Sequence, residues 1–265
     1  MRTKLVALDI DGTIVHAHSP GEVPSPRVTG AIRALSEAGI AVVLASGRML
    51  PGTRVVAKHL GLATPMICQQ GCSIHNSAGE IVHEFELPRE LALELVGHAN
   101  DRGHAYEWFN PLRYIVSRWT AESEEYARVS GVKPEYIANP EHSGVTPTGV
   151  GIITSLEHAN GVHRELVARH GDALHVLDFP AVTVAVAPEA NKGHALSLVA
   201  AMLGIDRHEA IAIGDSVNDA AMLAWAGRGY AMAHADRYAL DAADEVLADD
   251  EGESLAALLE SLVRD

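Results

Sequence analysis

The chain has 265 residues, of which 48% are hydrophobic and 21% are charged, a composition typical of an ordinary globular protein. The formal net charge is −15 at pH 7 and Lys and Arg form no run, so a nucleic-acid partner is not expected. The first apolar stretch is too short for a signal peptide and no stretch approaches the ~20 apolar residues of a membrane span, so we expect no membrane partner and a cytoplasmic location.

The N-terminal part of the chain alternates short apolar runs with helical patterns. Such alternation predicts a parallel sheet whose strands are joined by right-handed crossovers. The predicted order is a strand at 4–8, a loop at 16–26, a helix at 27–37, a strand at 40–45 and a helix at about 53–60. Residues 66–86 then predict a short strand and a hairpin with its turn at 76–79.

A different pattern follows, and it predicts an α+β insert with a mostly antiparallel sheet. The predicted helices of this insert are 88–102, 119–130 and 157–169, and its predicted strands are 104–109, 112–117, 150–155, 173–179 and 182–187. The first pattern then resumes, with a helix from the N-cap Asn191 to Leu203, a strand at 210–213 and a helix at about 220–226. We therefore predict an α/β fold with a Rossmann-like parallel-sheet core, residues 1–84 and 188–265, and an inserted α+β domain, residues 85–187.

Acidic residues follow several of the predicted parallel strands. Asp9 and Asp11 follow the first strand, and Asp215 and Asp219 follow the strand at 210–213. In open α/β sheets this edge is where ligands bind. Carboxylates crowded there repel one another unless a hard cation holds them, and oxygen-only ligation suits Mg²⁺. Each of these residues taken alone is explained as well by capping of a helix.

Four short motifs resemble a known family when they are taken in their order along the chain. They are Asp9-Ile10-Asp11-Gly12-Thr13, Ser46-Gly47-Arg48, Lys192-Gly193 and Gly214-Asp215-Ser216-Val217-Asn218-Asp219. This set resembles the haloacid dehalogenase superfamily, and in particular the Cof-type phosphatases with a type IIB cap, over nearly the whole chain. The resemblance implies that residues 85–187 form the cap, which sets substrate specificity, and that the enzyme is a Mg²⁺-dependent phosphoric monoester hydrolase acting on sugar phosphates or similar small metabolites.

The resemblance also implies a role for each residue of the motifs. Asp9 is the expected nucleophile, which forms an aspartyl-phosphate, and Asp11 is the expected general acid and base. The residues expected to bind the phosphoryl group are Lys192, Ser46, Asn218 and the amides of Ile10 and Gly47. The expected Mg²⁺ ligands are Asp9, Asp215 and the backbone carbonyl of Asp11, while Asp219 is expected to orient Lys192 or metal-bound water.

Some residues depart from the family pattern or are open to more than one interpretation. Gln70-Gly71-Cys72 stands where the family usually has Asn-Gly-Ala, and Ala233-His234-Ala235 stands where it usually has Gly-Asn-Ala; both put leaving-group recognition in doubt. His16 and His18 follow Asp11, where solvation in the loop is the more ordinary role. Aromatic and basic side chains of the insert are candidate substrate contacts, although packing within the insert explains them as well: Trp108, Phe109, Arg113, Tyr114 and Trp119.

Two other functions remain open at this stage. A sugar phosphomutase of the phosphomannomutase type shares this kind of cap and the first motif, and differs in passing the phosphoryl group to a second sugar. A phosphometabolite-binding protein on an inactive scaffold is expected to lack one of Asp9, Asp11, Lys192 or Asp215, and this chain has all of them. Neither the individual substrate nor the oligomeric state follows from the sequence.

Overall fold

The computed structural model describes residues 2–16, 23–248 and 250–264, so His18 and most of the predicted loop at 16–26 lie outside the described residues. The chain divides into two compact units. The first unit consists of the stretches up to Val82 and from Asn191 onward, and the second consists of His83–Ala190. The assignment of residues 1–84 and 188–265 to a catalytic core, and of residues 85–187 to a cap, stays a prediction.

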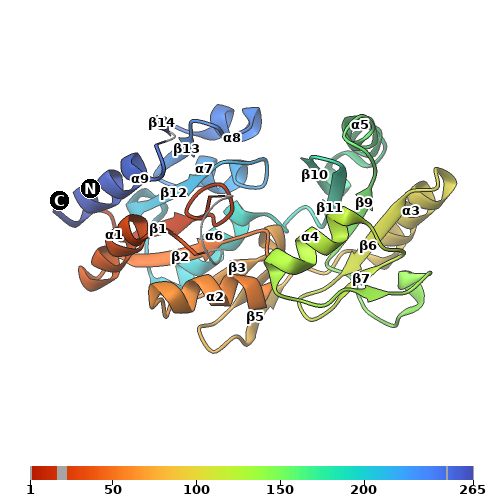
Figure 1. Ribbon diagram of the computed structural model, residues 1–265, viewed down its shortest axis with the longest axis horizontal. Helices are drawn as coiled ribbons and strands as arrows, with labels where there is room; N and C mark the ends of the chain where they lie inside the picture. The colour runs from red at the N-terminus through yellow and green to blue at the C-terminus, as the bar shows by residue number, and fades with distance from the viewer. Residues whose placement is uncertain (1, 17–22, 249, 265) are drawn as a thin grey trace. The chain divides into compact units, whose positions relative to one another are not determined.

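The first unit is built on a sheet whose order, among the described residues, is β14-β13-β12-β1-β2-β3-β4-β5. The pairs from β14 to β3 are all parallel, and β4 pairs antiparallel with β3. The strands are β1 Leu5–Leu8, β2 Ala41–Ala45, β3 Met66–Cys68, β4 Ser73–His75, β5 Ile81–Glu84, β12 Ala210–Gly214, β13 Arg228–Met232 and β14 Glu245–Leu247. The helices are α1 Pro26–Glu37, α2 Leu50–Leu60, α6 Lys192–Leu203, α7 Ala220–Trp225, α8 Arg237–Ala242 and α9 Glu253–Arg264 (Figure 1).

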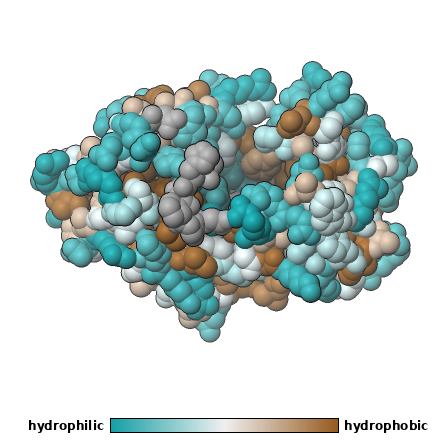
Figure 2. Space-filling view, viewed as in Figure 1, coloured by the Kyte–Doolittle hydropathy of each residue, from teal (hydrophilic) through white to brown (hydrophobic). Residues whose placement is uncertain are grey.

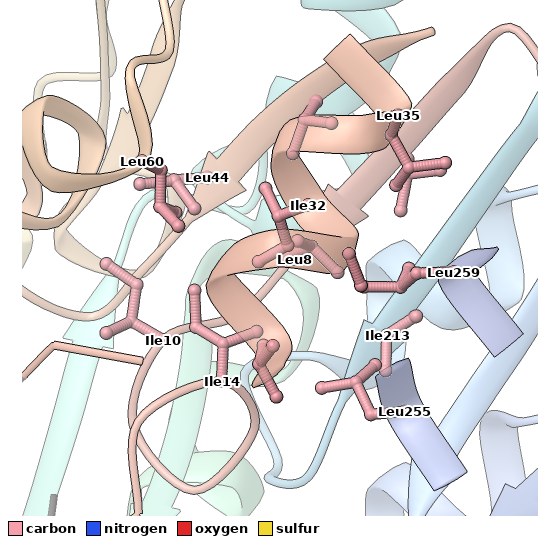
Figure 3. Close-up of a cluster of buried hydrophobic side chains, with 14 of the residues drawn as sticks. Leu8, Ile10, Ile14, Ile32, Leu35, Leu44, Leu60, Ile213, Leu255 and Leu259 are labelled. Atoms are coloured by element: carbon pink, nitrogen blue, oxygen red, sulfur yellow. The ribbon is translucent and has the colours of Figure 1, made fainter. Parts of the chain in front are cut away.

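Each face of this sheet is covered by helices, because alternate side chains of the buried strands point to opposite sides. Val6 and Leu8 of β1 pack in one cluster, whereas Leu5 and Ala7 pack in another. Figure 3 shows the first cluster, in which side chains of the sheet meet helices α1 and α9: Leu8, Leu44, Ile213, Ile32, Leu35, Leu255 and Leu259. The second cluster contains residues of α6, α7 and α8. A parallel sheet buried on both faces confirms the predicted fold class.

The helix boundaries follow from local chemistry. Ser25 caps α1 by accepting a hydrogen bond from the Val28 amide at 3.3 Å. Asn191 caps α6 by accepting one from the His194 amide at 2.8 Å, as the sequence indicated. Helix α2 begins at Leu50, earlier than the predicted start at about residue 53. Pro51 lies in its first turn, where backbone N–H groups have no partner within the helix, so a proline is tolerated there.

The second unit is an α+β sandwich with the sheet order β10-β11-β9-β6-β7-β8. Its strands pair antiparallel, except that the short β8, which was not among the predicted strands, runs parallel to β7. The strands are β6 Ala105–Phe109, β7 Tyr114–Val116, β8 Glu135–Tyr136, β9 Gly149–Ile153, β10 His175–Phe179 and β11 Val182–Val186. The helices are α3 Arg89–Asp101, α4 Ala121–Ser130 and α5 Ala159–His170.

The core of the second unit lies between its sheet and helices α3 and α5. Leu95 of α3 and Leu166 of α5 pack with Trp108 and Ile152 of the sheet. The indole Nε1 of Trp108 donates a hydrogen bond to the Val145 carbonyl at 2.9 Å, so this buried aromatic side chain is satisfied within the unit.

The face of the molecule shown in Figure 2 is mostly hydrophilic, with hydrophobic residues in separate small patches. Among the described residues, no helix combines the length and the hydrophobicity that crossing a membrane requires.

Two glycines in helices of the first unit should respond oppositely to substitution by alanine. A Cβ on Gly193 would lie 2.3 Å from the Ala221 carbonyl oxygen, whereas a Cβ on Gly30 would meet nothing within 4 Å. We expect Gly193→Ala to lower the free energy of unfolding by about 1–3 kcal/mol through overpacking. Gly30→Ala should raise it by about 0.5–1 kcal/mol because alanine loses less backbone entropy in a helix. Urea denaturation measures both; equal effects would contradict the close approach of α6 to α7.

Candidate active site

The ends of four neighbouring strands meet at one edge of the sheet in the first unit. Leu8, the last residue of β1, pairs with Ile213 of β12 and with Leu44 of β2. Asp9 therefore follows β1 between the residues that follow its two neighbours, Asp215 after β12 and Ser46 after β2. Gln69 follows β3, the next strand along. This is the edge at which open α/β sheets bind ligands.

Three carboxylates gather at this edge. Asp9, Asp215 and Asp219 each offer an oxygen within 4.8 Å of the others. Asp9 is only 4% exposed and Asp219 is fully buried. Because buried carboxylates repel one another and have lost their water, this group needs cations to hold it together.

Lys192 is one such cation. Its Nζ lies 2.5 Å from Asp9 Oδ1 and 2.6 Å from Asp219 Oδ1, and its side chain is fully buried. Lys192 is the first residue of α6, where the helix dipole disfavours a positive charge. The two carboxylates account for this placement. One ammonium beside three carboxylates still leaves the cluster with an excess of negative charge.

The pKa values of the cluster reflect burial and this crowding. Burial, followed by the charge of Asp219, raises the pKa of Asp9 well above its usual value, and Lys192 opposes the rise. The same two causes raise the pKa of Asp215 to about 6. Burial acts to lower the pKa of Lys192, but the charges of Asp219 and Asp9 outweigh it and the pKa is raised. A further cation at this edge would favour the ionised form of these carboxylates.

Asp219 uses both carboxylate oxygens within the protein. Oδ1 accepts a hydrogen bond from Lys192, and Oδ2 accepts hydrogen bonds from the amides of Asp215 and Ser216, both at 3.0 Å. These bonds fix the loop that carries Asp215. The role expected for Asp219, to orient Lys192 or metal-bound water, stays a prediction.

The turn after Asp9 is shaped to receive Asp215. Gly12 has a φ of 85°, and a Cβ there would lie 2.4 Å from Asp215 Oδ2, so glycine fits both the backbone and the space. The hydroxyl of Thr13 donates a hydrogen bond to Asp215 Oδ1 at 2.9 Å. The Nε2 of His234 lies 2.9 Å from the Gly12 carbonyl oxygen, so this departure from the family pattern contacts the first motif directly.

Asp11 is held by Arg48. The guanidinium Nε and Nη2 of Arg48 bond to Asp11 Oδ2 and Oδ1 at 2.8 Å and 2.5 Å. The side chain of Arg48 is 3% exposed, whereas that of Asp11 is 49% exposed. The sequence-based expectations include no role for Arg48, although an arginine three residues after the buried strand β2 was a signal for a buried acidic partner.

The expected phosphoryl-binding residues lie along the same edge. The buried Ser46 accepts a hydrogen bond from the Arg48 amide at 3.1 Å through its Oγ, which leaves its hydroxyl hydrogen to donate. Asn218 accepts one from Ser216 Oγ at 2.7 Å through its Oδ1. The Ile10 carbonyl oxygen accepts from the Val15 amide at 2.8 Å. Their contact with a phosphoryl group stays a prediction, as does that of the Ile10 and Gly47 amides.

The substrate-contact candidates of the insert lie in the second unit. Trp108, Phe109 and Tyr114 are buried in that unit, and Arg113 pairs with Glu135 at 2.6 Å. Trp119 is exposed. Packing therefore accounts for the buried three, and contact with substrate stays a prediction for all of them. His16 is partly buried beside the edge described above, with its ring 6.3 Å from that of His234.

The buried ammonium of Lys192 should contribute far more to stability than an exposed one. Lys192→Met keeps the side-chain length but leaves Asp9 and Asp219 without their ammonium partner, so we expect a loss of about 3–5 kcal/mol in the free energy of unfolding in chelator. The matched change Lys4→Met removes the surface pair with Glu209 at 2.8 Å and should cost no more than about 1 kcal/mol. Comparable losses in the two variants would show that Lys192 does not balance the cluster.

Comparison with known proteins identifies the family. The model of the haloacid dehalogenase-like hydrolase family matches residues 6–259. A phosphoglycolate phosphatase from Halorubrum lacusprofundi is 30% identical over 259 residues, covering 97% of this chain and 96% of the relative. The names of such relatives support the predicted enzyme class, a phosphoric monoester hydrolase.

Solved structures share the fold. A haloacid dehalogenase-like hydrolase from B. subtilis has a TM-score of 0.84 at 22% identity, covering 97% of this chain and 99% of its own. A sugar phosphatase of haloacid dehalogenase subclass IIB has a TM-score of 0.83 at 20% identity, covering 98% of this chain and all of its own (100%). The family match over almost the whole chain, together with these folds, confirms the resemblance carried by the four motifs: this chain belongs to the haloacid dehalogenase-like hydrolases.

Proposed function

We propose that this protein is a Mg²⁺-dependent phosphatase that hydrolyses small phosphorylated metabolites through a phosphorylated Asp9. The observation that carries the proposal is the buried Lys192 ammonium, which bonds to Asp9 and Asp219 at 2.5 Å and 2.6 Å beside a third carboxylate, Asp215. A buried cation beside a nucleophile can stabilise the negative charge of a transferring phosphoryl group.

In the first step a carboxylate oxygen of Asp9 attacks phosphorus, and the bond from phosphorus to the leaving oxygen breaks. Asp11 gives its proton to that oxygen, and the product is an acyl phosphate on Asp9. In the second step Asp11 takes a proton from water, and the resulting hydroxide attacks phosphorus. Inorganic phosphate leaves, and the Asp9 carboxylate is regenerated.

Residues of this chain suit a Mg²⁺ ion. The available donors are all oxygens, and the charge of the carboxylate cluster exceeds that of Lys192. Asp9, Asp215 and the Asp11 backbone carbonyl would hold the ion. When bound there, Mg²⁺ would neutralise charge on the carboxylates and on the transferring phosphoryl group.

The general acid already has a partner within the protein. Both oxygens of Asp11 accept hydrogen bonds from Arg48, and each oxygen keeps a second lone pair that can carry the proton for the leaving group. The half-exposed side chain of Asp11 has the freedom to exchange its contacts, whereas Asp9 is buried and fixed by Lys192. This difference supports a fixed nucleophile and a movable proton donor.

The phosphoryl oxygens are bound, in this proposal, by the Ser46 hydroxyl, the Asn218 amide, Lys192 and the backbone amides of Ile10 and Gly47. Preorganised donors of this kind act most strongly where charge develops in the transition state. Residues 85–187 act as the cap that recognises the organic part of the substrate, which the fold of the subclass IIB sugar phosphatase supports.

The names of relatives, which include phosphoglycolate phosphatase and HMP-PP phosphatase, support a small phosphorylated metabolite as the substrate. These names favour hydrolysis over the mutase alternative, in which a second sugar takes the phosphoryl group. We would test phosphoglycolate first, together with sugar phosphates, which the name of the subclass IIB structure suggests.

Removal of Mg²⁺ should abolish release of phosphate from all of these compounds. Chelator should stop turnover, Mg²⁺ should restore it, and Ca²⁺ should inhibit, because its larger and more flexible coordination disturbs the octahedral geometry. Undiminished turnover in excess chelator would contradict the requirement for a metal ion.

Mg²⁺ at about 100 times its Kd should also raise the free energy of unfolding by about 2.7 kcal/mol. Asp215→Asn should lose this stabilisation, whereas Asp178→Asn, at an exposed carboxylate bonded to Asn160, should keep it.

Asp9 and Asp11 should be separable by trapping the intermediate. With p-nitrophenyl phosphate, whose leaving group needs little protonation, Asp11→Asn should still become phosphorylated on Asp9 and then stall, because no base activates water. Asp9→Asn should lose turnover by at least about three orders of magnitude and form no adduct. Rapid quench followed by hydroxylamine treatment and mass spectrometry detects the acyl phosphate. An adduct in the Asp9 variant, or on another residue, would refute these roles.

A further inference from the structure

The loop after β3 has an unusual backbone. Gln69, Gln70 and Gly71 have φ values of 51°, 65° and 103°, so three consecutive residues lie in the left-handed region. Glycine and asparagine adopt this region more readily than glutamine does. Such strain persists only where the surrounding contacts hold it in place.

Those contacts join the loop to three segments of the active site. The amide of Gln70 donates a hydrogen bond to the Ser46 carbonyl at 3.2 Å. A Cβ on Gly71 would lie 2.3 Å from the backbone carbon of Asn191, so the loop packs directly against the residue before Lys192. The side-chain Oε1 of Gln70 accepts a hydrogen bond from Asn218 Nδ2.

The side chain of Gln70 also lies against Gly47. A Cβ on Gly47 would be 2.7 Å from Gln70 Nε2, so the glycine provides the room that this amide occupies. Gln70 is therefore packed between Gly47 and Asn218, two residues proposed to bind the phosphoryl group. This position differs from the expectation that the Gln70-Gly71-Cys72 departure affects the leaving group.

The bond to Gln70 determines how Asn218 presents its donor. The Asn218 amide has one acceptor and one NH₂ group: Oδ1 accepts from Ser216, and one N–H of Nδ2 donates to Gln70. A primary amide nitrogen carries two hydrogens, so the second N–H stays available to an anion. Rotation of the Asn218 amide by 180° would place Oδ1 against Gln70 Oε1, two acceptors that cannot bond, so the contact with Gln70 fixes the orientation of the amide.

We infer that Gln70 is a positioning residue: it holds the Asn218 amide so that its free N–H can donate to the phosphoryl group. Gln70 does not recognise the leaving group. The inference rests on the proposed function, because it takes Asn218 as a phosphoryl donor. If so, loss of the Gln70 side-chain amide lowers the affinity for every phosphorylated ligand by the same factor. This includes inorganic phosphate, which has no leaving group.

Gln70→Met removes the side-chain amide and keeps nearly the same side-chain length. Methionine tolerates the left-handed backbone at this position no worse than glutamine does. We expect phosphate to bind the Mg²⁺-loaded variant about tenfold more weakly by calorimetry, the loss typical of a misdirected hydrogen bond to a charged group. The value of kcat/KM should fall by a similar factor for p-nitrophenyl phosphate and for phosphoglycolate. Unchanged phosphate affinity with a loss that differs between the two substrates would assign Gln70 to the leaving group and overturn the inference.

A double-mutant cycle tests whether Gln70 acts through Asn218. In the Asn218→Ala background, Gln70→Met should change phosphate affinity by less than about twofold, because the donor that it positions is already gone. Additive losses would mean that Gln70 acts by another route and would also overturn the inference.

Gln69→Met is the matched control, since it makes the same change at the preceding left-handed position. It should leave phosphate affinity within about twofold of the wild type, and an equal loss would show that only loop packing matters. If Gln70→Met does not fold, Gln70→Gly serves in its place, because glycine suits a φ of 65°. Phosphate binding without turnover of any substrate would disprove the phosphatase activity and still decide the role of Gln70.

Discussion

The site depends on one electrostatic constraint, the burial of Lys192 among Asp9, Asp215 and Asp219. Each of these groups alone would be costly in the interior, and the cost is offset only where opposite charges meet at hydrogen-bond distance. Lys192 satisfies Asp9 and Asp219 at 2.5 Å and 2.6 Å, which leaves negative charge on the side of Asp215. Burial, followed by the charge of Asp219, raises the pKa of Asp215 to about 6, and the excess negative charge creates the demand for a second cation.

Close packing of the backbone makes this concentration of charge possible. A Cβ at Gly12 would lie 2.4 Å from Asp215 Oδ2, one at Gly193 would lie 2.3 Å from the Ala221 carbonyl oxygen, and one at Gly214 would lie 2.4 Å from Asp219 Cγ. Each glycine lies in a motif that also contributes a charged residue. The glycines therefore set the distances over which the charged residues act.

The edge of the sheet carries two kinds of polar group with different mobility. Asp9, Asp219 and Lys192 are buried and bonded to one another, which fixes them in one arrangement. Asp11 projects from the same turn but is half exposed and held by the buried guanidinium of Arg48. A rigid nucleophile beside a proton donor with an exchangeable partner fits a two-step reaction, in which the donor acts twice in opposite directions.

The fold class and the strand ends that carry the site could be predicted from the residues alone, because buried parallel strands appear as continuous apolar runs and charged residues follow them closely. The cap at Asn191 could be predicted as well, since it is a local interaction between residues three apart. The partners that lie far apart in the chain became apparent only from the structure: Arg48 with Asp11, Thr13 with Asp215, His234 with Gly12, and Gln70 with Asn218. The physical reason is that hydrogen bonds between loops depend on the twist and register of the strands that bring them together, and no local pattern of residues encodes those distances.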